Sequence, residues 1–273
     1  MLKELFVPLI DVFSLFNIFR YITFRAAYAA VTALFLSFIL GPPLIRYLKK
    51  VKIGQNVRDE VPETHFAKTG TPTMGGILIN FSIIISVLLW QDLNTLFTWL
   101  GIVAVIGFGL IGFADDYFKV FKKNPQGIKA WQKFIAQVFV SLAIVLIIYF
   151  TGDENTTLLY IPFFKHPVLD LGVFYIPLAV LLLVYTSNSV NLTDGLDGLA
   201  TGLMILVGIA FAVLSYLTGR ADYAAYLAIP YIAESGELTV LSFAVVGAAV
   251  GFLWYNSHPA EIMMGDTGSL ALG

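Results

Sequence analysis

Carboxylates and carboxamides gather at the ends of long apolar runs in this sequence. Asp115-Asp116 follows one such run, Asp266 precedes another, and the polar turn 188–198 lies between two more. Adjacent carboxylates at a helix C-terminus repel each other and face the negative end of the helix dipole, so they need a compensating cation. Mg²⁺ suits them because it takes one or two carboxylates together with phosphate oxygens. The pattern therefore indicates metal-assisted chemistry on a phosphate group.

Each of these groups also has an ordinary structural explanation. Asp115 could pair with Lys119 one helical turn on, and Asp266 could cap the helix that follows it. One cap needs one residue, whereas the turn 188–198 offers five: Asn188, Asn191, Thr193, Asp194 and Asp197. Gly195 and Gly198 allow a ligand to approach the backbone closely. The surplus favours a polar-ligand site, and a helix beginning near Asp266 would offer free N–H groups to a phosphate.

A fourth polar stretch, 62–76, is dense in Gly, Thr and Pro, which is unusual for a passive loop. Its single histidine, His65, is more typical of a structural residue, and Lys68 could be an ordinary interfacial charge. Lys133 and Gln137 lie one turn apart at the start of an apolar run. By themselves they would be interpreted as interfacial anchors.

The composition is that of a membrane protein. Of the 273 residues, 58% are hydrophobic and only 12% charged, about half the charged fraction of an ordinary soluble domain. The absence of cysteine excludes disulfides and thiolate metal sites. The segment 1–20 is interrupted by charges and lacks the pattern of a signal peptide.

Apolar segments of membrane length predict an all-α, polytopic integral membrane protein. We expect a single domain over 1–273, with about seven complete transmembrane helices and the start of an eighth near Thr267. Gly41-Pro42-Pro43 is expected to close the first helix, and Thr71-Pro72 to open the second. The expected spans are 21–40, 74–90, 96–114, 134–150, 171–187, 199–217 and 238–255.

The basic residues predict the orientation of the chain in the membrane. The loops after the first and third expected spans hold 11 of the 16 Lys and Arg residues, so they are expected to be cytoplasmic. Parity then places 188–198 and 256–266 on the same side, and 151–170 and 218–237 outside. All the polar groups described above thus face the cytoplasm.

Four stretches closely resemble the bacterial phospho-N-acetylmuramoyl-pentapeptide transferase family, part of the polyprenyl-phosphate sugar-1-phosphate transferase superfamily. The resemblance covers essentially the whole chain, with the motifs in the family's order. The superfamily shares the acidic pair Asp115-Asp116 and the last Asp, Asp266. The stretches Thr71-Pro-Thr-Met-Gly-Gly76 and Asn191-Leu-Thr-Asp-Gly-Leu-Asp-Gly198 indicate the peptidoglycan branch. The four are Pro62-Glu-Thr-His with Lys68-Thr-Gly-Thr-Pro-Thr-Met-Gly-Gly76, Asp115-Asp-Tyr-Phe-Lys119, Asn191-Leu-Thr-Asp-Gly-Leu-Asp-Gly-Leu-Ala200, and Met264-Gly-Asp-Thr-Gly-Ser-Leu-Ala-Leu-Gly273.

The resemblance implies a reaction and its partners. It implies transfer of phospho-MurNAc-pentapeptide from UDP-MurNAc-pentapeptide to undecaprenyl phosphate, giving lipid I and UMP, the first membrane step of peptidoglycan synthesis. It further implies Mg²⁺ as cofactor, a homodimer in the bacterial cytoplasmic membrane with the active site on the cytoplasmic face, a ten-helix fold and no nucleic-acid partner.

The resemblance also implies roles for particular residues. Asp266 would be a Mg²⁺ ligand, and Asp116 would help to hold the metal and the diphosphate. Asp115 would be the base that deprotonates the lipid phosphate or, in a competing two-step scheme, the nucleophile. The nucleoside pocket would hold Asn191, Asp194, Gly195, Leu196 and Asp197, with Asn256 and Met263 beside it. Phosphate or sugar–peptide groups would meet Lys68, Thr73, Lys119 and Lys133.

One departure from the family bears on activity. The family carries further spans and a His-rich cytoplasmic loop after the last acidic motif, whereas this sequence stops at Gly273. We therefore expect residues 1–273 alone to be an inactive fragment. Two alternatives stay open at this point: a related transferase of another UDP-sugar, such as UDP-GlcNAc, and an ion-coupled transporter, although transporter carboxylates typically lie near the membrane midplane.

Overall fold

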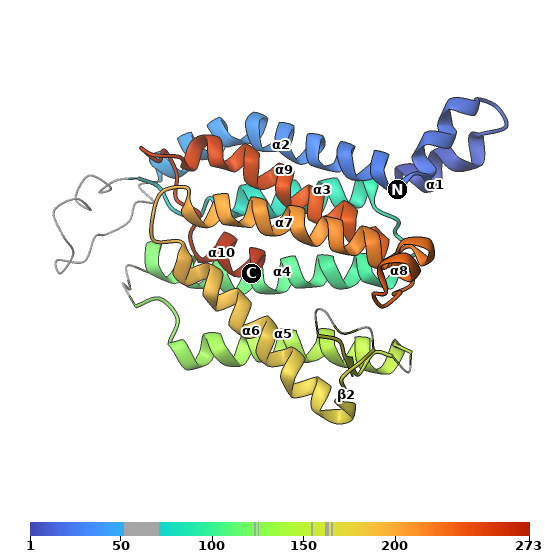
Figure 1. Ribbon diagram of the computed structural model, residues 1–273. Helices are drawn as coiled ribbons and strands as arrows, with labels where there is room; N and C mark the ends of the chain where they lie inside the picture. The colour runs from blue at the N-terminus through green and yellow to red at the C-terminus, as the bar shows by residue number, and fades with distance from the viewer. Residues whose placement is uncertain (52–70, 123, 125, 154, 162–163, 165) are drawn as a thin grey trace.

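Helices make up nearly all the regular structure of the computed structural model, which describes residues 1–51, 71–122, 124, 126–153, 155–161, 164 and 166–273. Six of the described helices are long and apolar enough to cross a membrane, and α3 is a shorter apolar helix. The predicted all-α membrane class is confirmed (Figure 1). The helices are α1 (Leu2–Phe6), α2 (Ile22–Lys50), α3 (Gly76–Trp90), α4 (Leu96–Val120), α5 (Ala130–Thr151), α6 (Tyr175–Thr193), α7 (Leu199–Thr218), α8 (Ala221–Leu227), α9 (Leu238–Asn256) and α10 (Asp266–Leu272).

Short elements connect these helices. Two-residue strands β1 (Leu158–Leu159) and β2 (Leu169–Asp170) pair in an antiparallel hairpin between α5 and α6. The remaining regular elements of the described residues are short 3-10 helices: η1 (Val7–Leu9), η2 (Ser14–Arg20), η4 (Gly172–Phe174) and η5 (Ser235–Glu237). None of these elements carries a residue of the expected site.

The end of the first long helix was predicted wrongly. The helix α2 continues through Pro42 and Pro43 to Lys50, well beyond the expected closure at Gly41. Pro42 has no N–H for the carbonyl of Phe38 four residues earlier. The hydroxyl of Tyr255, on α9, donates a hydrogen bond of 3.1 Å to that carbonyl instead. A neighbouring helix thus satisfies the group that proline leaves open, as membrane helices allow.

The helix α4 also runs further than expected, to Val120, so Asp115 and Asp116 lie inside its last turns and not at its end. Phe113, Tyr117 and Phe121 stack along one face of this extension, at centroid distances of 6.3 and 4.8 Å. Stacking of these rings supports the helix beyond the apolar run. Asp115 and Asp116 therefore project from a regular part of α4.

The core lies where α9 packs against α2 and α3. Gly247 faces α2 so closely that a Cβ there would lie 2.0 Å from the carbonyl oxygen of Ala30. Gly251 approaches Ser37 in the same way, with 2.6 Å between such a Cβ and the serine Cβ. Small residues allow membrane helices to approach to backbone contact, where van der Waals packing is strongest. The core therefore holds α2, α3 and α9 together beside α4.

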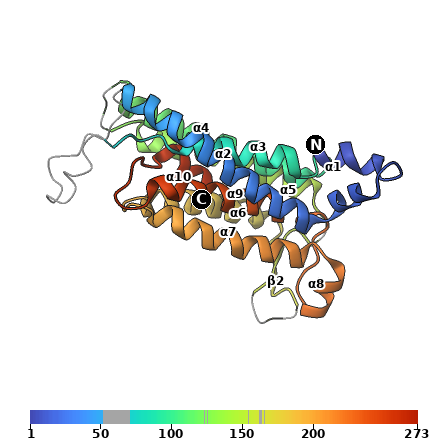
Figure 2. The same ribbon diagram turned by 90° about the horizontal axis from the view of Figure 1, so that it is seen from above.

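The elements that carry the described site residues meet at one end of the bundle (Figure 1, Figure 2). The C-terminal ends of α2, α4, α6 and α9 are at this end, on the left of Figure 1, and α10 lies inside the bundle nearby. The N-terminal segment, the β hairpin and α8 are at the opposite end. The alternation of loops thus matches the one derived from the basic residues.

A buried ion pair joins the helices at the end opposite the site. The Arg25 guanidinium, 1% exposed, donates to both carboxylate oxygens of Glu237 at 2.5 and 2.6 Å. The same carboxylate accepts the backbone N–H of Asp92 at 3.0 Å. Burial raises the pKa of Asp92, but hydrogen bonds from Lys3 and Asn94 outweigh it and bring this pKa to about 2. This network connects α2, η5 directly before α9, and the α3–α4 loop.

Glu237→Ala is expected to destabilise the protein strongly. The substitution leaves the Arg25 charge buried without its partner, which costs about 3–5 kcal/mol of unfolding free energy. Thermal unfolding in detergent measures the loss, with Asp222→Ala as the control because that carboxylate forms an exposed pair with Arg220. A double Arg25→Leu, Glu237→Leu variant should recover much of the stability. Equal melting temperatures for Glu237→Ala and wild type would contradict this assignment.

Candidate active site

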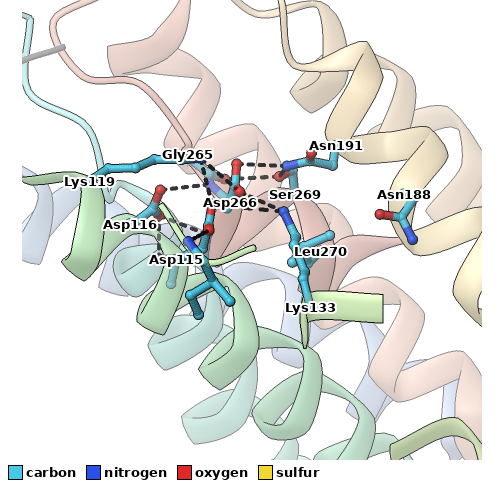
Figure 3. Close-up of polar contacts among 12 residues, drawn as sticks. Asp115, Asp116, Lys119, Lys133, Asn188, Asn191, Gly265, Asp266, Ser269 and Leu270 are labelled. Atoms are coloured by element: carbon cyan, nitrogen blue, oxygen red, sulfur yellow. Dashed lines mark hydrogen bonds and ion pairs between the residues drawn. The ribbon is translucent and has the colours of Figure 1, made fainter. Parts of the chain in front are cut away.

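Six of the expected residues meet around the first turn of α10 (Figure 3). They come from four helices that are distant in sequence, so only the packing of the bundle brings them together. The six are Asp115, Asp116 and Lys119 on α4, Lys133 on α5, Asn191 on α6 and Asp266 on α10.

Asp266 lies at the centre of this cluster. Its Oδ2 accepts hydrogen bonds from Lys133 Nζ at 2.7 Å and Lys119 Nζ at 3.0 Å. Its Oδ1 accepts one from Asn191 Nδ2 at 2.8 Å, and the same amide group also contacts Ser269 Oγ at 2.8 Å. Three neighbouring helices therefore determine the position of this carboxylate.

Asp115 faces the same two lysines. Its Oδ2 lies 2.6 Å from Lys119 Nζ and 3.9 Å from Lys133 Nζ, while its Oδ1 accepts the N–H of Ile128 at 2.7 Å. Gly127 brings the α4–α5 loop to this carboxylate with a φ of +62°, and a Cβ there would lie 2.5 Å from Asp115 Oδ1. A glycine is required because both the left-handed backbone and the close approach exclude a side chain.

The cluster fits a divalent cation that needs only one or two protein ligands. Asp115 and Asp266 present oxygens to the same two ammonium groups, so two carboxylates converge on one space. Within the described part of the chain, no three His, Asp or Glu side chains form an all-protein metal cage. Mg²⁺ is commonly held by one or two carboxylates, with substrate phosphates and water completing its octahedron.

Asp116 turns away from this space and contacts the backbone of α10. Its Oδ1 accepts the N–H of Asp266 at 3.2 Å, and its Oδ2 accepts the N–H and the hydroxyl of Thr267 at 2.9 and 2.6 Å. The expectation that α10 offers free N–H groups to a phosphate is therefore wrong, because a carboxylate from α4 already accepts them.

Two of the motifs singled out in the sequence pair through their backbones. Met263 donates its N–H to Pro72 O at 2.8 Å and accepts the N–H of Gly75 at 2.9 Å, and Gly76 N donates to Met264 O at 2.8 Å. Thr73 and Met263 are both buried in this contact. Thr73 and Met263, both expected to contact substrate, thus lie in the paired segments that precede α3 and α10.

Asn256, the last residue of α9, holds the α6–α7 turn next to the cluster. Asn256 is buried, and its Oδ1 accepts the N–H of Gly198 at 3.1 Å and the hydroxyl of Thr201 at 2.9 Å, while its Nδ2 donates to Ile262 O at 3.0 Å. It therefore joins α7, α9 and the segment before α10. Like Met263, this expected pocket residue has its polar groups bonded within the protein.

The acidic residues of that turn differ in their surroundings. Asp197 Oδ2 lies 3.1 Å from His258 Nδ1 and 3.3 Å from the backbone nitrogen of Ala260. Asp194 directly follows α6, and Gly195 and Leu196 come next on the surface, where Leu196 is 58% exposed. The turn adjoins the cluster through Asn191, on the last turn of α6. Lys68 and His65 lie outside the described residues.

A cavity of about 520 Å³ opens between α5 and α6 beside Lys133. Gln137, expected only as an interfacial anchor, is buried in its wall and accepts a hydrogen bond of 2.8 Å from Asn188 Nδ2. Trp131 and Phe134 supply apolar surface at its rim. A ligand with both polar and apolar parts could thus lie next to Lys133 and Asp266.

Three contacts of the site were not expected from the sequence. The Thr267 hydroxyl and the Ile128 N–H each hold one carboxylate of the acidic pair, and the His258 ring lies against Asp197. A backbone N–H carries no sequence signal. The polar residues Ser257 and His258 directly after an apolar run were the one available indication for the histidine contact.

Comparison with known proteins gives two kinds of match. Residues 98–273 match the family model described as glycosyl transferase family 4. A protein of Thermodesulfovibrio yellowstonii is 50% identical over all of this chain and 76% of its own length, and those of Oleidesulfovibrio alaskensis and Citrifermentans bemidjiense are 48% and 46% identical with the same coverage. All three relatives are named phospho-N-acetylmuramoyl-pentapeptide-transferase.

Proposed function

We infer the reaction from the premise that this chain belongs to the phospho-N-acetylmuramoyl-pentapeptide transferase family. It is a membrane phosphotransferase of peptidoglycan synthesis that moves phospho-MurNAc-pentapeptide from its UDP carrier to a polyprenyl phosphate. The observation that carries this function is the meeting of Asp115, Asp266, Lys119 and Lys133 at one end of an apolar bundle. A water-soluble diphosphate and a membrane-embedded phosphate can both reach such a place.

We propose Mg²⁺ as the cation and Asp266 as its carboxylate ligand. Asp116 would help to hold Asp266 in place, since it accepts the N–H of that residue. The cation would neutralise charge on the diphosphate as it develops in the transition state. Lys119 and Lys133, now 3.0 and 2.7 Å from Asp266 Oδ2, would contribute positive charge to the same phosphates. Phosphoryl transfer depends mostly on such positioning and neutralisation.

Asp115 is the residue that we propose for proton or group transfer. As a base, it would take the proton of the acceptor phosphate, whose oxygen then bonds to the sugar-linked phosphorus as the bond to UMP breaks. As a nucleophile, its carboxylate would displace UMP first and be displaced by the acceptor afterwards. Its hydrogen bond from Ile128 and its contact with Lys119 hold the carboxylate in place for either scheme.

The remaining assignments are proposals supported by the resemblance and by charge placement. We propose undecaprenyl phosphate as the acceptor, and the turn from Asp194 to Asp197 as part of the nucleoside pocket because it adjoins Asp266 through Asn191. We also propose the cytoplasmic face of the bacterial inner membrane as the location of the site, since most of the described Lys and Arg residues lie at this end: Arg46, Lys49, Lys50, Lys119, Lys122, Lys129 and Lys133. A homodimer is proposed from the resemblance alone.

The choice of nucleotide sugar tests this function. We expect UMP release with UDP-MurNAc-pentapeptide to exceed that with UDP-GlcNAc by at least about 10²-fold in kcat/KM, because a site built to bond a larger polar group discriminates strongly against a substrate that lacks it. UMP release by the purified enzyme with undecaprenyl phosphate measures both rates. Preference for UDP-GlcNAc would instead support the related transferase, and no release with either sugar by the protein at the full length of its relatives would refute the transferase function.

A further inference from the structure

The first turn of α10 is held from outside its own helix. A helix N-terminus leaves its first N–H groups without partners inside the helix, and a nearby residue in the sequence usually caps them. In α10 the preceding residue, Gly265, forms no side-chain cap. Asp116, which precedes Asp266 by 150 positions, accepts the N–H groups of Asp266 and Thr267 instead.

These contacts occupy both oxygens of the Asp116 carboxylate. Oδ1 accepts one hydrogen bond and Oδ2 accepts two, the shorter of them from the Thr267 hydroxyl at 2.6 Å. The side chain is only 3% exposed, so little of it faces the space where Asp115 and Asp266 meet the lysines. The geometry of Asp116 is therefore that of a helix cap.

Close backbone packing supports the same turn. A Cβ at Gly112, one turn before Asp116 on α4, would lie 2.0 Å from the carbonyl oxygen of Asp266. A Cβ at Gly76, at the start of α3, would lie 2.0 Å from the backbone nitrogen of Gly268. The backbone around Asp266 thus rests directly on two neighbouring helices, with the Asp116 cap between them.

We propose that Asp116 is a positioning residue that fixes the Asp266 backbone, and through it the carboxylate that faces the reacting phosphates, without itself taking the metal. The inference rests on the proposed function, in which Asp266 is the metal ligand. The N–H that Asp116 holds belongs to Asp266 itself, so a shift of the cap displaces the carboxylate relative to Lys119 and Lys133. Residues that orient metal ligands commonly change affinity or activity about 10–100-fold when replaced.

Thr267→Val tests this role without touching a carboxylate. The change removes the hydroxyl that donates to Asp116 and keeps the size of the side chain. We expect kcat to fall about 10-fold, at the low end of the range for such orienting residues, with the KM for UDP-MurNAc-pentapeptide nearly unchanged. Thr267→Ser restores the hydroxyl and should recover most of the loss. The matched control is Thr239→Val, because Thr239 is a buried threonine on α9 that donates to Ala212 O.

Asp116→Asn is the second arm of this test. It should lower kcat by more than Thr267→Val, and raising Mg²⁺ should not restore the rate, because the defect lies in the placement of Asp266. The double variant should be no slower than Asp116→Asn alone, since both changes remove the same contact. If Thr267→Val lowers the melting temperature markedly, Thr267→Ala removes the same hydroxyl with a smaller side chain and replaces it.

The opposite results would overturn the proposal. A direct metal ligand at position 116 predicts wild-type kcat for Thr267→Val and recovery of Asp116→Asn at high Mg²⁺. Failure of the underlying function is distinguishable, because it would appear as wild-type turnover without a divalent cation or as full activity of Asp266→Asn.

Discussion

Asp115→Asn should abolish transfer while the enzyme still binds UDP-MurNAc-pentapeptide. An amide can neither take the acceptor's proton nor attack phosphorus, so we expect kcat to fall by about 10²–10⁴-fold. The fold should survive, because the amide oxygen can still accept the N–H of Ile128. Formation of the lipid-linked product and UMP release measure turnover, and equilibrium binding of the UDP substrate measures the intact pocket.

The control for this variant is Asp222→Asn, at an exposed carboxylate on α8 at the opposite end of the bundle. It should have wild-type turnover. Unchanged turnover in Asp115→Asn would refute the assignment of Asp115 in both schemes. Wild-type enzyme also separates the schemes: one UMP released per enzyme without the lipid acceptor indicates a two-step reaction, and none indicates direct transfer.

Asp266→Asn should cause a loss of at least about 10²-fold in kcat and shift the Mg²⁺ dependence to higher concentrations. The change removes the charge of the proposed ligand at nearly constant size, and one missing centre of electrostatic stabilisation costs about 10²–10³-fold. Three hydrogen bonds from Lys119, Lys133 and Asn191 converge on this carboxylate, so its neutralisation also leaves two ammonium groups with less negative charge around them.

A Mg²⁺ titration of initial rates, with Asp222→Asn alongside, measures this effect. The control should retain the wild-type half-saturating concentration. If Asp266→Asn changed the maximal rate but left the half-saturating Mg²⁺ concentration at the wild-type value, Asp266 would not be a metal ligand.

Much of the architecture could be predicted from the sequence. A bilayer core offers no hydrogen bonds, so a long apolar segment has to form a helix, and hydropathy alone locates it. The alternation of such helices then placed Asp115, Asn191 and Asp266 at one end of the bundle. This argument is independent of side-chain packing and therefore needed no structure.

Two local predictions were wrong because a residue distant in sequence bonds to a backbone group that the local sequence leaves without a partner. Gly41-Pro42-Pro43 predicts a helix end, but Tyr255 donates to the carbonyl that Pro42 leaves open, and α2 continues. The start of α10 looked open to a phosphate, but Asp116 accepts its N–H groups. In both cases the deciding partner lies far away in the sequence, so no local rule could find it.

The sequence by itself determined the class of the protein, the alternation of its helices and the family to which it belongs, because these follow from hydropathy, charge placement and the motifs. Only the tertiary structure decided which groups each carboxylate contacts. Asp115 and Asp116 are neighbours in sequence, yet successive residues of a helix point about 100° apart. Asp115 therefore meets the lysines and Asp266, whereas Asp116 meets the backbone of α10.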